Sequence, residues 1–389
     1  MPGFELIGSE EKSLVNEIFE QSNGVLFAHG FVGLRNGRYR VREFEKAFAA
    51  KLGCGHAQAV SSGTIAQYVA MLAMGVKAGD EVITQAFTFV ATVEAIIAIG
   101  AVPVIVDIDD TYNIDPVAME RAITPKTKLI IPVHMLGNPC DMDRIQAIAL
   151  KHSIPVLEDA CEALGATYHG RQAGTLAEAG VYSLDFAKTI TTGEGGMIVT
   201  NDPAIHTYCR EYHDHGHESN PAVPRGRDTR SIPGLNFRMT EMQAAVGLAQ
   251  VQKLDQIVAT NRRNKGALKQ VLRQSDRIQF RRITDEAGDL ADTLIFNFES
   301  KALCDAFLKQ YLAAGLITKN VPDAIDWHFA GTWNHMFHSV PAYRDTWRTA
   351  WARSAELLDR SVAVPIFVKP SADDLRRQGE TMLKILNGL

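Results

Sequence analysis

The stretch SLDFAKT, Ser183 to Thr189, is followed after two residues by the glycine-rich turn TGEGG, Thr192 to Gly196. The β-branched run that ends at Ser183 predicts a strand, so Lys188 lies just beyond a strand end. A lysine in a glycine-rich, sparsely charged loop can lose its hydration and act as a nucleophile. A single lysine is more often a solvated surface residue, so its interpretation depends on the motifs that accompany it.

Two earlier strand ends carry such motifs. The turn SSGT, Ser61 to Thr64, lies between a predicted strand and a predicted helix, where small residues and a helix N-terminus favour an anion. Asp159 ends an apolar strand and can pair with a cationic ring nitrogen. Each motif alone is typical of an ordinary helix cap. Together with Lys188 they match the needs of pyridoxal 5'-phosphate: a Schiff-base lysine, an acid that keeps the ring nitrogen protonated, and a turn that binds phosphate.

The surrounding sequence predicts the fold class. Residues 56–200 alternate short β-branched runs with helical patterns, which indicates an α/β fold with a mostly parallel sheet covered by helices on both faces. The pattern then changes, and the capping box Thr240-x-x-Gln243 begins a long helix. The last hundred-odd residues mix helices with weaker strands. We expect a large domain over residues 1–255 and a small C-terminal α+β domain over residues 256–389.

The composition excludes several classes of protein. The 389 residues are 46% apolar and 22% charged, as in ordinary soluble globular proteins. A net charge of −5 without a long basic run argues against a nucleic-acid partner. No apolar run has membrane-spanning length, and the N-terminus lacks a signal-peptide pattern, so we expect a cytoplasmic protein with no membrane partner. Five scattered cysteines are expected to be reduced thiols.

The segment HDHGH, residues 213–217, has the composition of a metal site. It continues a predicted helix into a loop, so its histidines do not share one face as strand residues would. We therefore expect no metal.

These motifs make the chain recognisable. It resembles the DegT/DnrJ/EryC1/StrS aminotransferases, the sugar-modifying branch of the aspartate-aminotransferase fold, densely from about residue 10 to 265 and more weakly beyond. The matching stretches include SSGT (61–64), LEDACEALGA (157–166), SLDFAKTITTGEGGMIVTND (183–202) and LNFRMTEMQAAVGLAQ (235–250). The resemblance implies fold type I of the pyridoxal-phosphate-dependent transferases, with a mostly parallel seven-stranded sheet in the large domain and a small C-terminal α+β domain.

The resemblance also implies roles for particular residues. The phosphate is bound by backbone N–H groups of Gly63 and Thr64 and by the Ser183 hydroxyl. Phe89 stacks on the pyridine ring, and Asp159 pairs with its nitrogen. The remaining implied roles are the Schiff-base lysine, Lys188, and an asparagine that reaches the phosphate of a partner subunit, Asn236. The active site is then expected at the interface of a homodimer.

Some positions depart from the family pattern. Glu162 stands where the family usually has Gln near the ring hydroxyl, and Leu164 stands where His is common. A Trp- and His-rich segment, residues 326–335, replaces the stretch that shapes the sugar pocket in many members. Trp327 and His328 are therefore candidate substrate residues, because aromatic faces suit sugar rings and histidines pair with carboxylates or hydroxyls. Arg238 is a candidate for binding the carboxylate of the amino donor, although a structural salt bridge is the stronger explanation for it.

The function that the resemblance implies is amino transfer from an amino acid, glutamate by analogy, to a keto- or aldehydo-sugar. Such amino sugars supply cell-surface polysaccharide, including lipopolysaccharide, or secondary metabolites. One alternative is a C8 aminotransferase acting on a free eight-carbon ulosonate (an 8-amino-3,8-dideoxy-octulosonate synthase), which details such as FAKTIT and HDHGHE favour. Others are a pyridoxal-phosphate-dependent sugar dehydratase and a non-catalytic regulatory homologue. Dehydrating members carry His in place of Lys188, and an intact Asp159 and Lys188 argue against lost chemistry.

Overall fold

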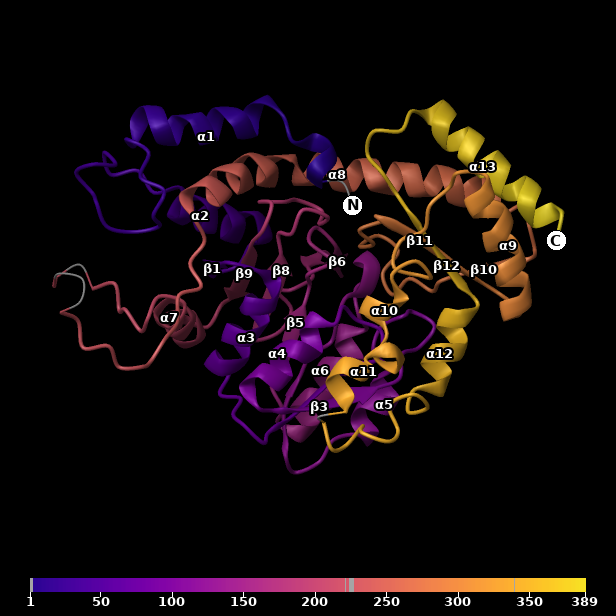
Figure 1. The fold of residues 1–389 in the computed structure, drawn as a ribbon, viewed down its shortest axis with the longest axis horizontal. Coiled ribbons are helices and arrows are strands. Elements are labelled where there is room, and N and C mark those ends of the chain that lie inside the picture. Colours follow the sequence, from indigo (N-terminus) through magenta and orange to yellow (C-terminus); the bar gives the residue numbers. More distant parts are fainter. Residues whose placement is uncertain (1–2, 221, 224–226, 339) are drawn as a thin grey trace.

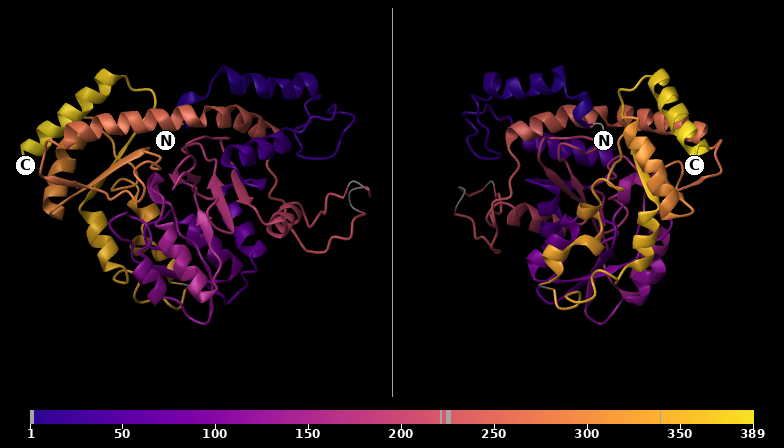
Figure 2. Two further views of the ribbon diagram at one scale, coloured as in Figure 1. Left: turned by 180° about the vertical axis from the view of Figure 1, so that it is seen from behind. Right: turned by 45° about the vertical axis from the view of Figure 1, so that its right-hand side comes forward.

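The computed structural model describes residues 3–220, 222–223, 227–338 and 340–389. Its longest element, α8 (Glu241–Leu272), extends along one side of the molecule, above both sheets (Figure 1). Near its start it packs against α1 (Ser9–Gln21) and α2 (Arg40–Leu52), and near its end against α13 (Ala372–Asn387). The view from behind and the view turned by 45° show the same arrangement (Figure 2). The short η1 (Gly3–Leu6) precedes α1.

In the part of the chain that the structure describes, the large sheet contains seven strands in two hydrogen-bonded groups. One group has the order β3-β2-β4 and the other β5-β8-β9-β1. Parallel bridges from Ile130 to Val156 and from Val133 to Asp159 join β4 to β5. In this row β9 is antiparallel to both of its neighbours, and every other adjacent pair is parallel, which confirms the predicted mostly parallel sheet. The strands are β1 (His56–Val60), β2 (Glu81–Gln85), β3 (Val102–Val106), β4 (Thr127–Ile130), β5 (Leu157–Asp159), β8 (Ala179–Ser183) and β9 (Gly196–Thr200).

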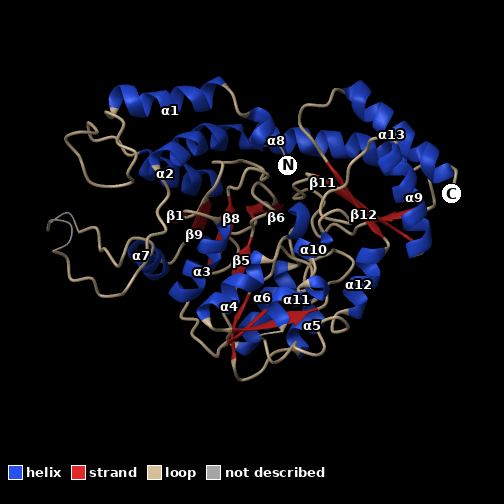
Figure 3. Ribbon diagram, in the orientation of Figure 1, coloured by secondary structure: helices blue, strands red, loops and turns tan. Residues whose placement is uncertain are grey.

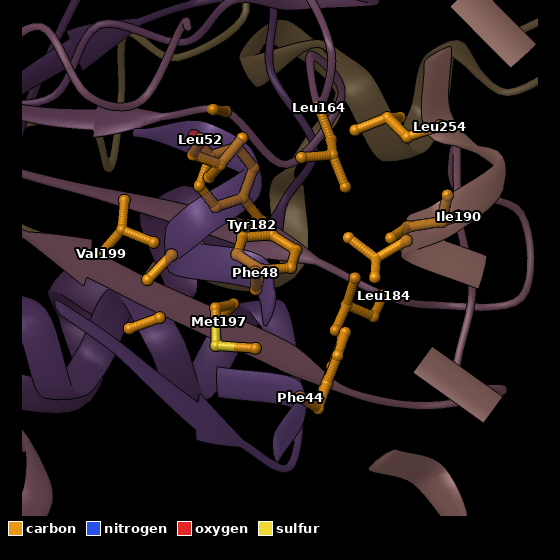
Figure 4. Close-up of a cluster of buried hydrophobic side chains, with 14 of the residues drawn as sticks. Phe44, Phe48, Leu52, Leu164, Tyr182, Leu184, Ile190, Met197, Val199 and Leu254 are labelled. Atoms are coloured by element: carbon orange, nitrogen blue, oxygen red, sulfur yellow. The ribbon is translucent and has the colours of Figure 1, made fainter. Parts of the chain in front are cut away.

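Helices cover both faces of this sheet. Successive side chains of a strand point to opposite faces, so Tyr182 of β8 packs with Phe44 and Phe48 of α2 beneath α8 (Figure 4). Its neighbour Val181 packs on the other face with Val69 of α3. The other helices of the large sheet are α4 (Ala91–Ile99), α5 (Pro116–Arg121), α6 (Met142–His152) and α7 (Pro203–Tyr212), with α3 at Gly63–Ala73. Shorter elements are η2 (Met135–Gly137) and the pair β6 (Thr167–Tyr168) and β7 (Arg171–Gln172).

A second, antiparallel sheet lies under the far end of α8 (Figure 3). It has the order β10 (Ile278–Phe280), β11 (Thr293–Phe298) and β12 (Ser361–Pro365). Phe296 of β11 and Phe307 of α9 (Lys301–Ala313) share a core with Leu268 of α8 and Met382 of α13. The domain boundary proposed at residue 255 falls within α8, which is unbroken there and contributes to the cores of both sheets.

Part of the C-terminal third returns to the large sheet. It contains α10 (Ile325–His328), η3 (Ala330–Thr332), α11 (Asn334–Phe337) and α12 (Ala352–Asp359). Trp333 and Trp351 are buried there with Phe87 and Val90, which follow β2. In Figure 1, α10 and α11 accordingly lie against the large sheet and its helices, away from β10 and α9. Among the described residues, no helix is long and apolar enough to cross a membrane.

Candidate active site

The motifs singled out in the sequence meet at one cavity of about 300 Å³. Gly63 and Thr64 begin α3, Asp159 ends β5, and Ser183 ends β8. Because β5 and β8 are parallel neighbours, their carboxyl ends lie at the same edge of the sheet, where α/β proteins bind ligands. The predicted residues that line this cavity are Gly63, Thr64, Phe89, Asp159, Glu162, Ser183, Lys188 and His328.

The start of α3 is built to bind an anion. Ser62 caps the helix by accepting a hydrogen bond from the N–H of Ile65 at 3.2 Å. The first N–H groups of a helix have no acceptor within it, and its dipole favours negative charge there. Glycine is required at position 63, because a Cβ atom would lie 2.7 Å from the Cβ of Ser183. The helix start thus comes close to the Ser183 hydroxyl, and the two together fit a phosphate group.

The Asp159 carboxylate is buried and held by several donors. Its Oδ2 accepts hydrogen bonds from Gln67 Nε2 and Thr92 Oγ1, both at 2.9 Å, and its Oδ1 accepts from the N–H of Cys161 at 3.1 Å. Burial raises the pKa of Asp159 above its ordinary value, although Cys161, Thr92 and the charge of Lys188 oppose that rise. A protonated ring nitrogen beside Asp159 would favour the charged form of this carboxyl group. An acid fixed in this way therefore suits such a ring.

Lys188 is a paired cation in this structure. Its Nζ lies 3.5 Å from Oε1 of Glu162. Burial alone would lower the pKa of Lys188, but nearby acidic groups, Glu162 first among them, raise it above its usual range. The desolvation predicted for Lys188 is present, since its side chain is largely buried, but the charge of Glu162 offsets the effect of burial on the pKa of Lys188.

Glu162 faces several polar groups as well as Lys188. Its Oε2 accepts from the N–H of Leu136 at 3.2 Å, and its Oε1 accepts from Asn320 Nδ2 at 3.4 Å. Burial alone would raise the pKa of Glu162, yet the positive charges of Lys188, His328 and Lys319 hold it below its ordinary value. The carboxylate that departs from the family pattern is therefore ionised and directed into the cavity.

An aromatic group forms one wall of the cavity. Phe89 is 40% exposed, and its ring stacks on Trp327 with centroids 6.3 Å apart and planes at 17°. The backbone holds this contact, because the N–H groups of Thr88 and Val90 donate to the carbonyls of His328 and Trp327, both at 2.9 Å. One face of Phe89 thus remains accessible to a flat ligand, and the aromatic surface continues outward to Trp327, which is 59% exposed.

His328 adds a second polar group to this wall. Its Nδ1 lies 2.7 Å from the carbonyl oxygen of Ala324, so Nδ1 carries a proton and donates it. The other ring nitrogen, Nε2, lies 4.0 Å from Oε1 of Glu162. Burial lowers the pKa of His328, against the opposing charge of Glu162. The remainder of the Trp- and His-rich segment does not line the cavity, since Trp333 is fully buried in the core and His335 is exposed.

Three predicted residues do not line the cavity of the single chain: Trp327, which lies beside it, and Asn236 and Arg238. Asn236 is exposed, and its backbone forms an isolated antiparallel β-bridge with that of Asp214. Arg238 pairs with the carboxylate of Asp214 and lies 5.0 Å from the ring centre of Phe27. The structural salt bridge considered from the sequence is thus present. Among the described residues, no cluster of three or more His, Cys, Asp or Glu is arranged for a metal ion.

Several residues that line the cavity were not predicted from the sequence, among them Gln67, Thr92 and Asn320. Gln67 could have been inferred, because it follows Gly63 by four residues and so shares its helix face. Thr92 lies in the first turn of α4, three residues after Phe89. Asn320 gives no local signal, since it reaches Glu162 from 158 positions along the chain.

The chain is similar to other proteins in both sequence and fold. It is 45% identical to GDP-perosamine synthase of Caulobacter vibrioides over 237 residues. The aligned region covers 61% of this chain and 62% of that protein. The match therefore spans less than two thirds of the relative. The fold is similar to 3-amino-5-hydroxybenzoic acid synthase, with a TM-score of 0.85, 28% identity and coverage of 100% and 99% of the two chains.

A further solved structure has a cofactor in its title. It is ntda from Bacillus subtilis with bound cofactor PMP, at a TM-score of 0.84, 26% identity and coverage of 99% of this chain and 84% of that one. The family model described as "DegT/DnrJ/EryC1/StrS aminotransferase family" matches residues 26–382. The chain belongs to the DegT/DnrJ/EryC1/StrS aminotransferase family.

Proposed function

We propose that the protein is a pyridoxal-phosphate-dependent aminotransferase that moves an amino group from an amino acid, glutamate in this proposal, to a keto- or aldehydo-sugar. The observation that carries the proposal is the meeting of the α3 N-terminus, Asp159 and Lys188 in one cavity. When bound, the cofactor supplies an electron-withdrawing ring on which an amino group can be carried between substrates. Family membership and the cofactor-containing relative support this assignment.

Each group in the cavity has a distinct task in this proposal. The N–H groups of Gly63 and Thr64 and the hydroxyl of Ser183 bind the phosphate. Asp159 holds the proton on the ring nitrogen, and Phe89 covers one face of the ring. Lys188 Nζ would hold the cofactor covalently and, once released from it, would serve as the base that moves protons during amino transfer.

The acceptor side of the site is formed by Trp327 and His328. Trp327 offers an exposed aromatic face beside the cavity, which suits the C–H edges of a sugar. His328 Nε2 and Glu162 offer acceptors to its hydroxyl groups. The 45% identity to a GDP-perosamine synthase favours a nucleotide-linked keto-sugar, and the free eight-carbon ulosonate is the alternative acceptor. The sugar-dehydratase alternative is disfavoured, because dehydrating members of the family carry His at the position of Lys188.

We further propose a homodimer with shared active sites. Segment 22–39 and the described part of segment 213–240 extend from the same side of the molecule (Figures 1 and 2). They contact each other through His29 and Asp214 at 3.1 Å, and they expose apolar side chains such as Phe31 and Leu235. Exposed Asn236 in this region is available to a second copy. Mixing Lys188→Ala with Asn236→Ala chains should regenerate one intact site per mixed dimer, whereas no recovered activity after proven subunit exchange would contradict sharing.

One experiment tests the core of the proposal. The protein is incubated with pyridoxal phosphate, reduced with borohydride and digested, and the pyridoxyl peptide is identified by mass spectrometry. We expect the adduct on Lys188, and an adduct elsewhere or none would refute the assignment. Glutamate should then convert the bound cofactor to its amine form, and each candidate sugar is scored by its ability to reverse that absorbance change. A panel of nucleotide-linked keto-sugars and the free ulosonate distinguishes the two acceptor classes.

A further inference from the structure

Gln67 lies at the centre of the candidate site, although no sequence motif assigned it a role. It lies on α3, one turn after Gly63, and its side chain is 2% exposed. It lines the cavity, and its Nε2 donates a hydrogen bond to Oδ2 of Asp159 at 2.9 Å. An amide of the phosphate-binding helix is thus in direct contact with the acid expected to face the ring nitrogen.

The orientation of this amide is fixed by Asp159. If the amide were reversed, Oε1 would face a carboxylate oxygen, and both atoms can only accept. Oε1 therefore lies at the other end of the amide, where it is buried and has no hydrogen-bond donor among the described residues. A buried acceptor without a donor is costly. An apolar side chain at position 67 would avoid the cost of this unpaired oxygen. The hydrogen bond from Gln67 to Asp159 therefore has to offset that cost.

A second donor reaches the same oxygen of Asp159. Thr92 Oγ1 lies 2.9 Å from Oδ2, and Thr88 Oγ1 lies 2.8 Å from Thr92 Oγ1. A hydroxyl has one proton, so Thr92 donates to Asp159 and accepts from Thr88. With the N–H of Cys161 on Oδ1, donors from α3, from α4 and from the turn after β5 hold the carboxylate in one orientation.

We propose that Gln67 is a positioning residue, whose amide acts with the Thr92 hydroxyl to orient the Asp159 carboxylate and to keep it charged opposite the cofactor's ring nitrogen. Hydrogen bonds donated to a carboxylate favour its charged form, and burial favours the neutral form. Lys188 and the Cys161 thiol are the other titratable groups that act on Asp159. Cys161 stays neutral because burial raises the pKa of its thiol. The inference rests on the proposed function, since it concerns the proton shared with a bound pyridine ring.

The test follows the proton on the ring nitrogen directly. Pyridoxal phosphate labelled with 15N in the ring is bound to wild type, Gln67→Met and Thr92→Val, and the 15N chemical shift is measured. Met keeps the approximate length of Gln and Val the shape of Thr, but neither donates. Loss of one donor makes Asp159 a stronger base, so the equilibrium should move roughly 10- to 100-fold toward a proton on Asp159, as for a hydrogen bond to a charged group. We expect the resonance to move from the pyridinium position toward that of neutral pyridine.

Two conservative variants separate positioning from a structural role. Thr92→Ser keeps a hydroxyl and should restore the wild-type resonance. Gln67→Glu can donate to Asp159 when its new carboxyl is protonated, but repels it when ionised. Its 15N shift should therefore resemble wild type at low pH and Gln67→Met at high pH, while the wild-type shift changes less over that range.

The outcomes distinguish this inference from the function on which it rests. If wild type binds no pyridoxal phosphate at Lys188, the proposed function fails. If wild type binds it with a protonated ring nitrogen, and Gln67→Met and Gln67→Glu bind it with unchanged, pH-independent resonances, the role of Gln67 is overturned alone. Should a Gln67 variant fold too poorly to bind, the Thr92→Val and Thr92→Ser pair provides the same comparison at the same oxygen. Identical resonances for that pair would also contradict the proposal.

Discussion

Replacing Gly63 by Ala tests the close packing on which the proposed phosphate site depends. The added Cβ would lie 2.7 Å from the Cβ and 3.1 Å from the Cα of Ser183. Ordinary contact begins near 3.4 Å, so the two segments must separate by about 0.7 Å. Ser183 belongs to β8, which is hydrogen-bonded on both sides by β5 and β9. The start of α3 is therefore expected to move instead of the strand.

This displacement has two measurable consequences. Overpacking of a well-packed site costs about 1–3 kcal/mol, so the free energy of unfolding of the apoprotein should fall by that amount. Moving the first N–H groups of α3 weakens at least one hydrogen bond to a charged phosphate, worth about 1.5–3 kcal/mol. The dissociation constant for pyridoxal phosphate should then rise roughly 10- to 150-fold. Denaturant unfolding and an absorbance titration of the apoprotein measure the two quantities.

Gly266→Ala is the matched control. Gly266 lies within α8, and a Cβ there would meet nothing within 4 Å. The same substitution should leave cofactor affinity unchanged and stabilise the helix by about 0.5–1 kcal/mol. Wild-type affinity in Gly63→Ala, with normal folding, would refute the argument that close packing against Ser183 positions the phosphate-binding turn.

Three further predictions concern the remaining site residues. Asp159→Asn should lower turnover by ~10³-fold, the scale of one lost electrostatic group; near wild-type steady-state rates would refute that role. Glu162→Gln removes the acidic group that does most to raise the pKa of Lys188, so this pKa should fall and amine labelling of the apoprotein at neutral pH should accelerate. An unchanged pH profile of labelling would contradict this. The double variant Trp327→Ala, His328→Ala should lower kcat/KM for the sugar and spare the half-reaction with the amino donor, whereas equal losses in both would indicate a structural role.

The elements nearest the cofactor could be predicted because their signals are local. Strands and helices alternate over residues 56–200 as predicted, and Thr240 caps α8 as its capping box indicated. The positions at which strands end follow from the spacing of apolar residues along the chain. The parallel packing of strands then brings their carboxyl ends together at one edge of the sheet. The sequence did not indicate strand order, nor that α8 would continue to Leu272 and support both sheets.

Contacts between distant segments could not be predicted in this way. The pairing of Thr88 with His328 joins positions 240 residues apart, and it depends on the burial of Trp333 and Trp351 against the large sheet. The charge state of Lys188 likewise depends on Glu162, which lies on a different loop. Local patterns identify the residue types, but electrostatics depends on which of them the fold brings within a few ångströms.

The origin of each wall of the cavity has a consequence for specificity. The cofactor side is built on strand ends and helix starts, where Asp159 and Ser183 are fixed by neighbouring strands. The proposed acceptor side is built on the four-residue helix α10, which backbone hydrogen bonds attach to the loop carrying Phe89. Side chains on α10 can change without disturbing those backbone hydrogen bonds, as long as Trp333 stays buried and holds the segment against the large sheet. We therefore expect substitutions at Trp327 to alter the choice of acceptor before they alter cofactor binding, and Trp333→Ala to impair both by releasing the segment.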